Sequence, residues 1–200
     1  APAGEDPRMT AIRNTLHDSA AGRHALDVMQ RHRVGTRLDT SDGGYYNPTT
    51  NTMTMNPNWD PNYQTTATVH EMNHAQAWQE GTSANRSLGT MSRDEYVDGM
   101  LQEEAHSDAV ANQAQRELEQ NGHDMSSSPA ANAGAYDRGY NQGVDAAGPD
   151  ATWEEMDASG RQAGEQSVLE EYRAGRVTTS TDGNPPYTDY YGGAWDRAHP

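Results

Sequence analysis

The chain has 200 residues, a length typical of one domain or of one domain with a lobe. It carries 30 acidic and 14 basic residues, and the resulting net charge of −16 argues against nucleic acid or an anionic membrane as the partner, because phosphate binding needs clustered cations. Cysteine is absent, which excludes disulfides, thiolate metal sites and thiol nucleophiles. Apolar runs are short, so we expect no transmembrane helix and no retained signal peptide.

The aliphatic content is unusually low. Leu, Ile, Val and Phe number 16 of 200 residues, a share below the roughly 20% at which a highly charged chain is suspected of disorder. Tyr, Met, Trp and Ala can fill a core in their place. We therefore expect a folded chain with a modest core that a bound metal helps to stabilise. All basic residues are Arg, which is typical either of a GC-rich genome or of a protein that works inside a foreign eukaryotic cell and offers no lysine for ubiquitin.

The first part of the chain predicts two short helices, a small sheet and a longer helix. Residues 1–7 are expected to be a flexible lead-in, and apolar residues then recur at helical spacing as far as about Arg33. Pro57 and Pro61 precede a helix over about residues 62–79, which Gly81 ends. We expect strands at residues 34–38, 45–46 and 52–55, of which the last is an edge strand. A turn is expected at residues 42–44, between the first two strands.

The second part predicts two long helices on either side of a loop. Acidic residues just after Ser92 favour a helix start there, and Gly122 is expected to end that helix. Residues 123–150 are rich in Ser, Ala, Gly, Asn and Pro, and we expect a long loop or insertion. A further helix is expected over residues 153–173, followed by a polar tail that ends in aromatic residues.

The central predicted helix contains the pattern His70-Glu71-Met72-Asn73-His74, an HExxH. Residues i and i+4 lie on one face of a helix, so both imidazoles can reach one zinc ion about 2.0–2.1 Å away. Glu71 lies beside the first histidine and can take a proton from a metal-bound water. So short a pattern also occurs by chance, and the alternative is a surface helix that happens to hold two histidines.

A catalytic zinc site needs a third protein ligand besides an open position for water. No histidine follows at the HExxHxxGxxH spacing, so this ligand has to come from elsewhere. The next helix offers Glu103 and Glu104, and a shift of one residue turns a side chain by about 100°, so only one of them can face the metal. Asp108 shares the face of Glu104 and could accept the free N–H of a zinc-bound imidazole, which favours Glu104. His106 lies on the opposite face.

At these two motifs the chain resembles the gluzincin metallopeptidases. The stretch Glu104-Ala105-His106-Ser107-Asp108 is similar to the Glu-x-x-Ser-Asp that follows HExxH in thermolysin-like members, with Glu103 where that family has Asn. The resemblance implies His70, His74 and Glu104 as zinc ligands, Glu71 as general base, and Asp108 as the hydrogen-bond partner of a ligand. The short layout looks more like the compact gluzincin domains of bacterial effectors and polymorphic toxins.

Such a peptidase also needs a donor for the oxyanion that develops in the transition state. Gluzincins often use a Tyr or His from the C-terminal part, and here the alternative for each tyrosine is simple packing of the tail. An extended peptide could pair with the backbone of residues 52–55. The candidate oxyanion donors are Tyr187, Tyr190 and Tyr191, with Tyr136 and Tyr140 behind them.

We predict an α+β, zincin-like fold with a backing helix, a small β-sheet, the HExxH helix, the glutamate helix and a helical C-terminal lobe. The predicted segments are a zincin core over residues 1–122, the loop over residues 123–150, and a helical segment over residues 151–200 whose aromatic tail packs on the core.

The expected function is hydrolysis of peptide bonds by a metalloendopeptidase with one catalytic zinc ion. The expected partners are a protein or peptide substrate and an immunity protein or inhibitor, with no nucleic acid and no membrane, and the protein is expected to be a monomer. We expect it to be secreted, as an enzyme or as an effector delivered into a host or rival cell. The alternatives are a non-catalytic zinc-stabilised binding domain and an assembly module with an accidental motif.

Overall fold

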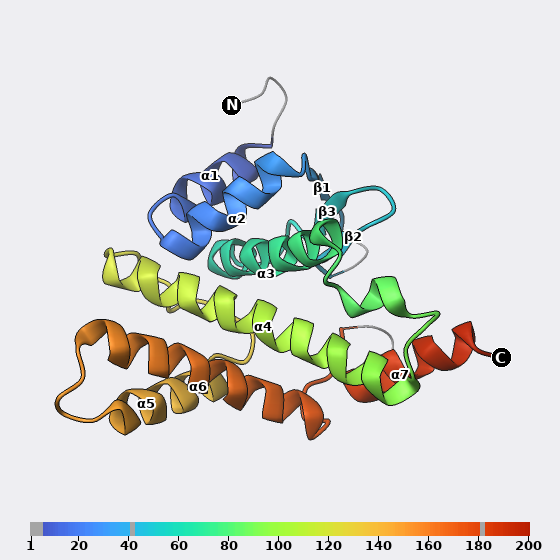
Figure 1. The fold of residues 1–200 in the computed structure, drawn as a ribbon. Coiled ribbons are helices and arrows are strands. Elements are labelled where there is room, and N and C mark those ends of the chain that lie inside the picture. Colours follow the sequence, from blue (N-terminus) through green and yellow to red (C-terminus); the bar gives the residue numbers. More distant parts are fainter. Residues whose placement is uncertain (1–5, 41–42, 181–182) are drawn as a thin grey trace. The chain divides into compact units, whose positions relative to one another are not determined.

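The computed structural model describes residues 6–40, 43–180 and 183–200 and has an α+β fold with a helical lobe (Figure 1). The chain divides into two compact units: the first comprises Ala1–Gln79 and Val110–Ala131, the second Glu80–Ala109 and Asn132–Pro200. The long helix α4 (Arg93–Gln120) contributes residues to both. Among the described residues, no helix has both the length and the apolar character needed to span a membrane.

The first unit holds the N-terminal helices, the sheet, α3 up to Gln79 and the last part of α4. Asp6 caps α1 by accepting a hydrogen bond from the Arg8 N–H, and Ser19 caps α2 in the same way. The predicted lead-in is therefore too long, because Pro7 already belongs to α1; its first five residues lie outside the described part. The bounds are α1 Pro7–Leu16, α2 Ala20–Arg31, β1 Gly35–Leu38, β2 Tyr45–Asn47, β3 Thr52–Met55 and α3 Pro61–Glu80.

The three strands form a sheet in the order β1-β3-β2. β1 pairs parallel with β3, with Gly35 opposite Thr52, and β2 pairs antiparallel with β3, with Tyr46 opposite Met53. The prediction that Thr52–Met55 is an edge strand is therefore wrong, and this strand cannot pair with an extended peptide. The Thr54 side chain is buried along with both methionines, so both faces of this central strand are covered. The predicted turn at 42–44 begins outside the described residues.

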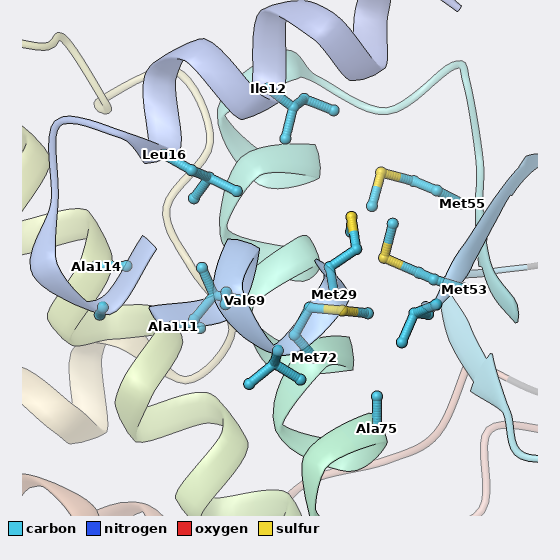
Figure 2. Close-up of a cluster of buried hydrophobic side chains, with 14 of the residues drawn as sticks. Ile12, Leu16, Met29, Met53, Met55, Val69, Met72, Ala75, Ala111 and Ala114 are labelled. Carbon is cyan, nitrogen blue, oxygen red and sulfur yellow. The ribbon is translucent and has the colours of Figure 1, made fainter. Parts of the chain in front are cut away.

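Methionine and alanine fill the core of the first unit. Figure 2 shows the side chains of Met53 and Met55 directed toward those of Met29 and Met72. Leu16 and Val69 belong to the same buried cluster, and Ala111 and Ala114 of α4 join it with their small side chains. Flexible, unbranched methionines adapt to the irregular space between the helices and the sheet, so few branched aliphatic residues are needed.

The second unit is helical and has an aromatic core. The main buried tyrosines come from four different helices, and the start of α6 is held by a capping box between Thr152 and Glu155. The helices are η1 Ala84–Ser87, α5 Ala133–Ala147, α6 Trp153–Arg173 and α7 Tyr187–Ala198, besides the first part of α4. The buried tyrosines are Tyr96, Tyr136, Tyr140, Tyr172 and Tyr191.

Helix α5 lies within the segment that was expected to be a loop, so that prediction is wrong for residues 133–147. The glycines that suggested a loop instead allow α5 and α6 to pack closely. A Cβ atom at Gly143 would lie 2.3 Å from the Ser159 carbonyl oxygen, and one at Gly160 would lie 2.8 Å from the Tyr140 ring. Residues 123–132 and 148–150 are irregular, as expected. Helix α7 was likewise not predicted as a separate element.

We expect Gly143→Ala to lower the free energy of unfolding by about 1–3 kcal/mol, because the added methyl group meets the α6 backbone and the helices must move apart. Gly134→Ala in the same helix is the matched control, since a Cβ there would meet only the Arg138 side chain at 3.8 Å. This control should be neutral or raise stability by up to about 1 kcal/mol. Urea unfolding followed by circular dichroism measures both, and equal effects of the two substitutions would contradict the packing argument.

Candidate metal centre

Helix α3 presents its histidines on the face away from the methionine core. Pro61 lies in the first turn of the helix, where the missing N–H removes no hydrogen bond because first-turn N–H groups have no acceptor within the helix. The Asp60 carboxylate accepts a hydrogen bond from the Asn62 N–H at 2.9 Å. Val69 and Met72, each 1% exposed, turn one side of the helix into the core of the first unit. Helical periodicity then leaves His70 and His74, both half-buried, on another side.

The two imidazoles converge. Their Nε2 atoms are 3.0 Å apart, and the ring centroids are separated by 4.8 Å. Tetrahedral zinc with Zn–N bonds of 2.0–2.1 Å would hold two ligand nitrogens about 3.3 Å apart. The observed separation is close to this value, so the pair fits a shared metal ion without rearrangement of the helix.

Glu71 lies between these histidines in sequence and is fixed by the sheet. Its side chain is 7% exposed, and its Oε2 accepts a hydrogen bond from the backbone N–H of Tyr46 at 2.7 Å. Tyr46 belongs to β2, an edge strand of the three-stranded sheet. A buried carboxylate needs such a donor, because an ionised group without one would lose its hydration uncompensated. The hydrogen bond therefore fixes the carboxylate of Glu71 next to the sheet edge.

Glu104 is buried on α4, with 5% of its surface exposed. Its Oε1 accepts a hydrogen bond from the hydroxyl of Tyr191 in α7. Burial raises the pKa of the Tyr191 hydroxyl well above its ordinary value, and the neighbouring Glu104 carboxylate raises it further. The phenol therefore stays protonated at neutral pH and acts as the donor in this pair.

Asp108 lies one turn further along α4 and is 1% exposed. Its Oδ2 accepts hydrogen bonds from the Tyr172 hydroxyl at 2.8 Å and from Asn132 Nδ2 at 2.7 Å. Burial raises the pKa of Tyr172, and the negative charge of Asp108 raises it further, so this phenol also stays protonated and acts as a donor. The bond from an imidazole N–H to Asp108 stays a prediction. Tyr172 and Asn132 belong to no recognisable motif, so the sequence gives no sign of their contact with Asp108.

The structure brings together three of the predicted side chains. One ligand atom from each of His70, His74 and Glu104 lies within 4.8 Å of the others. In the described ranges no second group of three or more His, Cys, Asp or Glu side chains meets the same criterion, and Glu103 is not part of this one. Two imidazole nitrogens and one carboxylate oxygen are the donor set of a known type of catalytic zinc site.

The other predicted tyrosines lie in different surroundings. Tyr136 and Tyr140 pack against glycines of α6, and the Tyr140 hydroxyl donates to Asp157 at 2.7 Å, so both join α5 to α6. The Tyr187 ring contacts that of Tyr172, with centroids 5.1 Å apart. Tyr190 is 39% exposed on α7. The Tyr191 hydroxyl donates a hydrogen bond to Glu104.

His106 is not part of the metal centre. Its side chain is 54% exposed, and its Nδ1 lies 3.2 Å from the Glu165 carboxylate. The hydrogen bond to Glu165 raises the pKa of His106, since it stabilises the charged imidazolium. This is a surface ion pair of small energetic weight, in keeping with the opposite helix face that the sequence predicted for this residue.

A helix with HExxH and a buried glutamate on the next long helix, within an α+β fold, define a metallopeptidase type of site. A family model described as "Putative metallopeptidase family (DUF6782)" matches residues 1–134. The chain belongs to this family. The matched range contains all five predicted site residues and ends at the start of α5, so that α6 and α7 lie beyond it. No curated protein and no solved structure matches the chain.

The zinc content of two isosteric variants tests the ligand set. Glu104→Gln removes the carboxylate charge but keeps an acceptor for Tyr191, and Glu103→Gln makes the same change on a neighbouring side chain. After zinc loading and dialysis, elemental analysis should find one equivalent in the wild-type protein and in Glu103→Gln, and little in Glu104→Gln. Full zinc retention by Glu104→Gln would contradict the assignment of Glu104 as a ligand.

Proposed function

We propose that this protein is a zinc-dependent endopeptidase of the gluzincin type. The observation that carries the proposal is the group formed by His70, His74 and Glu104, with the buried carboxylate of Glu71 next to the first histidine in sequence. A zinc site with a purely structural role has no use for a general base at this position, and it is usually closed by a fourth protein ligand. Membership of a metallopeptidase family supports the same function.

The three grouped side chains would hold zinc, because two imidazoles and a carboxylate suit this borderline ion. When bound, zinc supplies a Lewis acid that polarises a carbonyl oxygen and makes water a stronger acid.

Glu71 is the proposed general base. Its Oε2 is held by the Tyr46 N–H, and we assign the proton transfer to Oε1. The carboxylate takes a proton from the attacking water, and the resulting carboxylic acid passes this proton to the nitrogen of the leaving amine. The hydrogen bond to the sheet orients the carboxylate before the reaction, so no side-chain ordering is needed in the transition state.

The proposed substrates are proteins outside the producing cell, cut by a secreted enzyme or by an effector delivered into another cell. The absence of lysine supports the effector form of this proposal, since a protein that works inside a foreign eukaryotic cell then offers no lysine for ubiquitin. The resemblance to compact gluzincin domains of effectors and polymorphic toxins points in the same direction. A protein of that kind would be accompanied by an inhibitor or immunity protein in the cell that makes it.

Substitution of Glu71 tests the proposed reaction. Glu71→Gln keeps an oxygen that can accept the Tyr46 N–H but removes the base, so we expect cleavage of unfolded protein substrates to slow by about 10²–10⁴-fold. Zinc content should be unchanged. The readout is mass spectrometry of new N-termini in a casein digest.

Glu80→Gln at the exposed end of the same helix is the matched control and should cleave normally. Removal of the metal with a chelator should stop cleavage, and added zinc should restore it. The mechanism fails if Glu71→Gln retains the wild-type rate, and zinc binding without cleavage in the wild-type protein would favour the non-catalytic zinc domain.

A further inference from the structure

The C-terminal helices supply hydrogen-bond donors to both buried carboxylates of α4. Tyr191 of α7 donates to Glu104, and Tyr172 of α6 donates to Asp108. Both helices lie beyond residue 134, where the family match ends. The predicted ligand and its neighbour one turn on are therefore fixed by a part of the chain that carries no metal-binding motif of its own.

Tyr191 is rigidly placed. Tyr191 is 8% exposed, and its ring packs edge-on against that of Tyr96 of α4, with centroids 6.2 Å apart. Two further contacts attach α7 to the beginning of α4 and the residues just before it: Trp195 Nε1 donates to the Met91 carbonyl oxygen at 3.0 Å, and Arg93 pairs with Asp196 at 3.0 Å. The hydroxyl therefore reaches Glu104 from a ring and a helix that are both held in place.

We propose that Tyr191 is a positioning residue that orients the Glu104 carboxylate for metal binding, and that α6 and α7 are thus a required part of the metal centre. The inference rests on the proposed zinc site. A free glutamate side chain samples several rotamers, and metal binding costs conformational entropy because it selects one of them. A hydrogen bond to one carboxylate oxygen restricts these rotamers in advance and so lowers that entropy cost. A phenol has one proton, so the proton given to Glu104 is not also given to an oxyanion.

Tyr172 orients the carboxylate of Asp108 in the same way. Its hydroxyl and the Asn132 amide both donate to Oδ2, which fixes the carboxylate on the same helix as Glu104. Removing this hydroxyl affects a residue that is not itself a proposed ligand. We therefore expect Tyr172→Phe to lower the zinc affinity less than Tyr191→Phe does.

Zinc affinity distinguishes a positioning residue from an oxyanion donor. In competition with a chromophoric chelator, Tyr191→Phe should bind zinc about 10–100-fold more weakly than the wild-type protein. Tyr190→Phe removes a hydroxyl from the neighbouring, partly exposed residue and should bind like wild type. The visible spectrum of the cobalt-substituted protein should change in Tyr191→Phe and not in Tyr190→Phe. Melting of the metal-free proteins shows whether both variants are folded.

Unchanged zinc affinity and an unchanged cobalt spectrum in Tyr191→Phe would overturn the inference, and a fall in kcat alone would assign the hydroxyl to the oxyanion instead. If Tyr191→Phe does not fold, Tyr172→Phe takes its place, and wild-type zinc affinity in that variant would also overturn the role of the C-terminal helices. A wild-type protein that binds no zinc would overturn the proposed function together with this inference, which makes the two failures distinguishable.

Discussion

Three buried carboxylates in a strongly acidic chain are the constraint on which the rest of this structure depends. Glu71, Glu104 and Asp108 are each less than 10% exposed in a protein with a net charge of −16. Burial of a carboxylate is unfavourable unless hydrogen bonds or a cation compensate for the lost hydration. Each of the three accepts a hydrogen bond from a group that is distant in sequence, and the long-range packing of both units serves to bring these donors into place.

Hydrogen bonds do not remove the charge, and this explains why a metal suits the site. The Tyr191 hydroxyl is a neutral donor, so the negative charge of Glu104 stays, close to two imidazoles whose Nε2 atoms are 3.0 Å apart. A divalent cation would compensate this charge, and its binding free energy would add to the free energy of folding. In a chain with so few aliphatic residues, such a contribution is large relative to the marginal stability of a typical domain.

The two units replace aliphatic residues in different ways. The first uses methionines, whose flexible side chains fill the space between helices and sheet. The second uses tyrosines set against glycines, as in the contacts of Tyr136 with Gly164 and of Tyr140 with Gly160. Large rings need small partners to reach interior packing density, so the glycine content that resembles a loop composition serves helix packing here.

Features that depend on local periodicity could be predicted from the order of the residues alone. His70 and His74 share a helix face because they are four residues apart, and the same spacing relates Glu104 to Asp108. Features that depend on long-range proximity could not be predicted in this way, and the central place of Thr52–Met55 and the helix within residues 133–147 are the two main examples. The donors to these carboxylates belong to the same class, since no pattern along the chain relates Tyr191 to a glutamate 87 residues earlier. Hydrophobic periodicity reports which side of an element is buried, but the partner that buries it is set by how the whole chain packs.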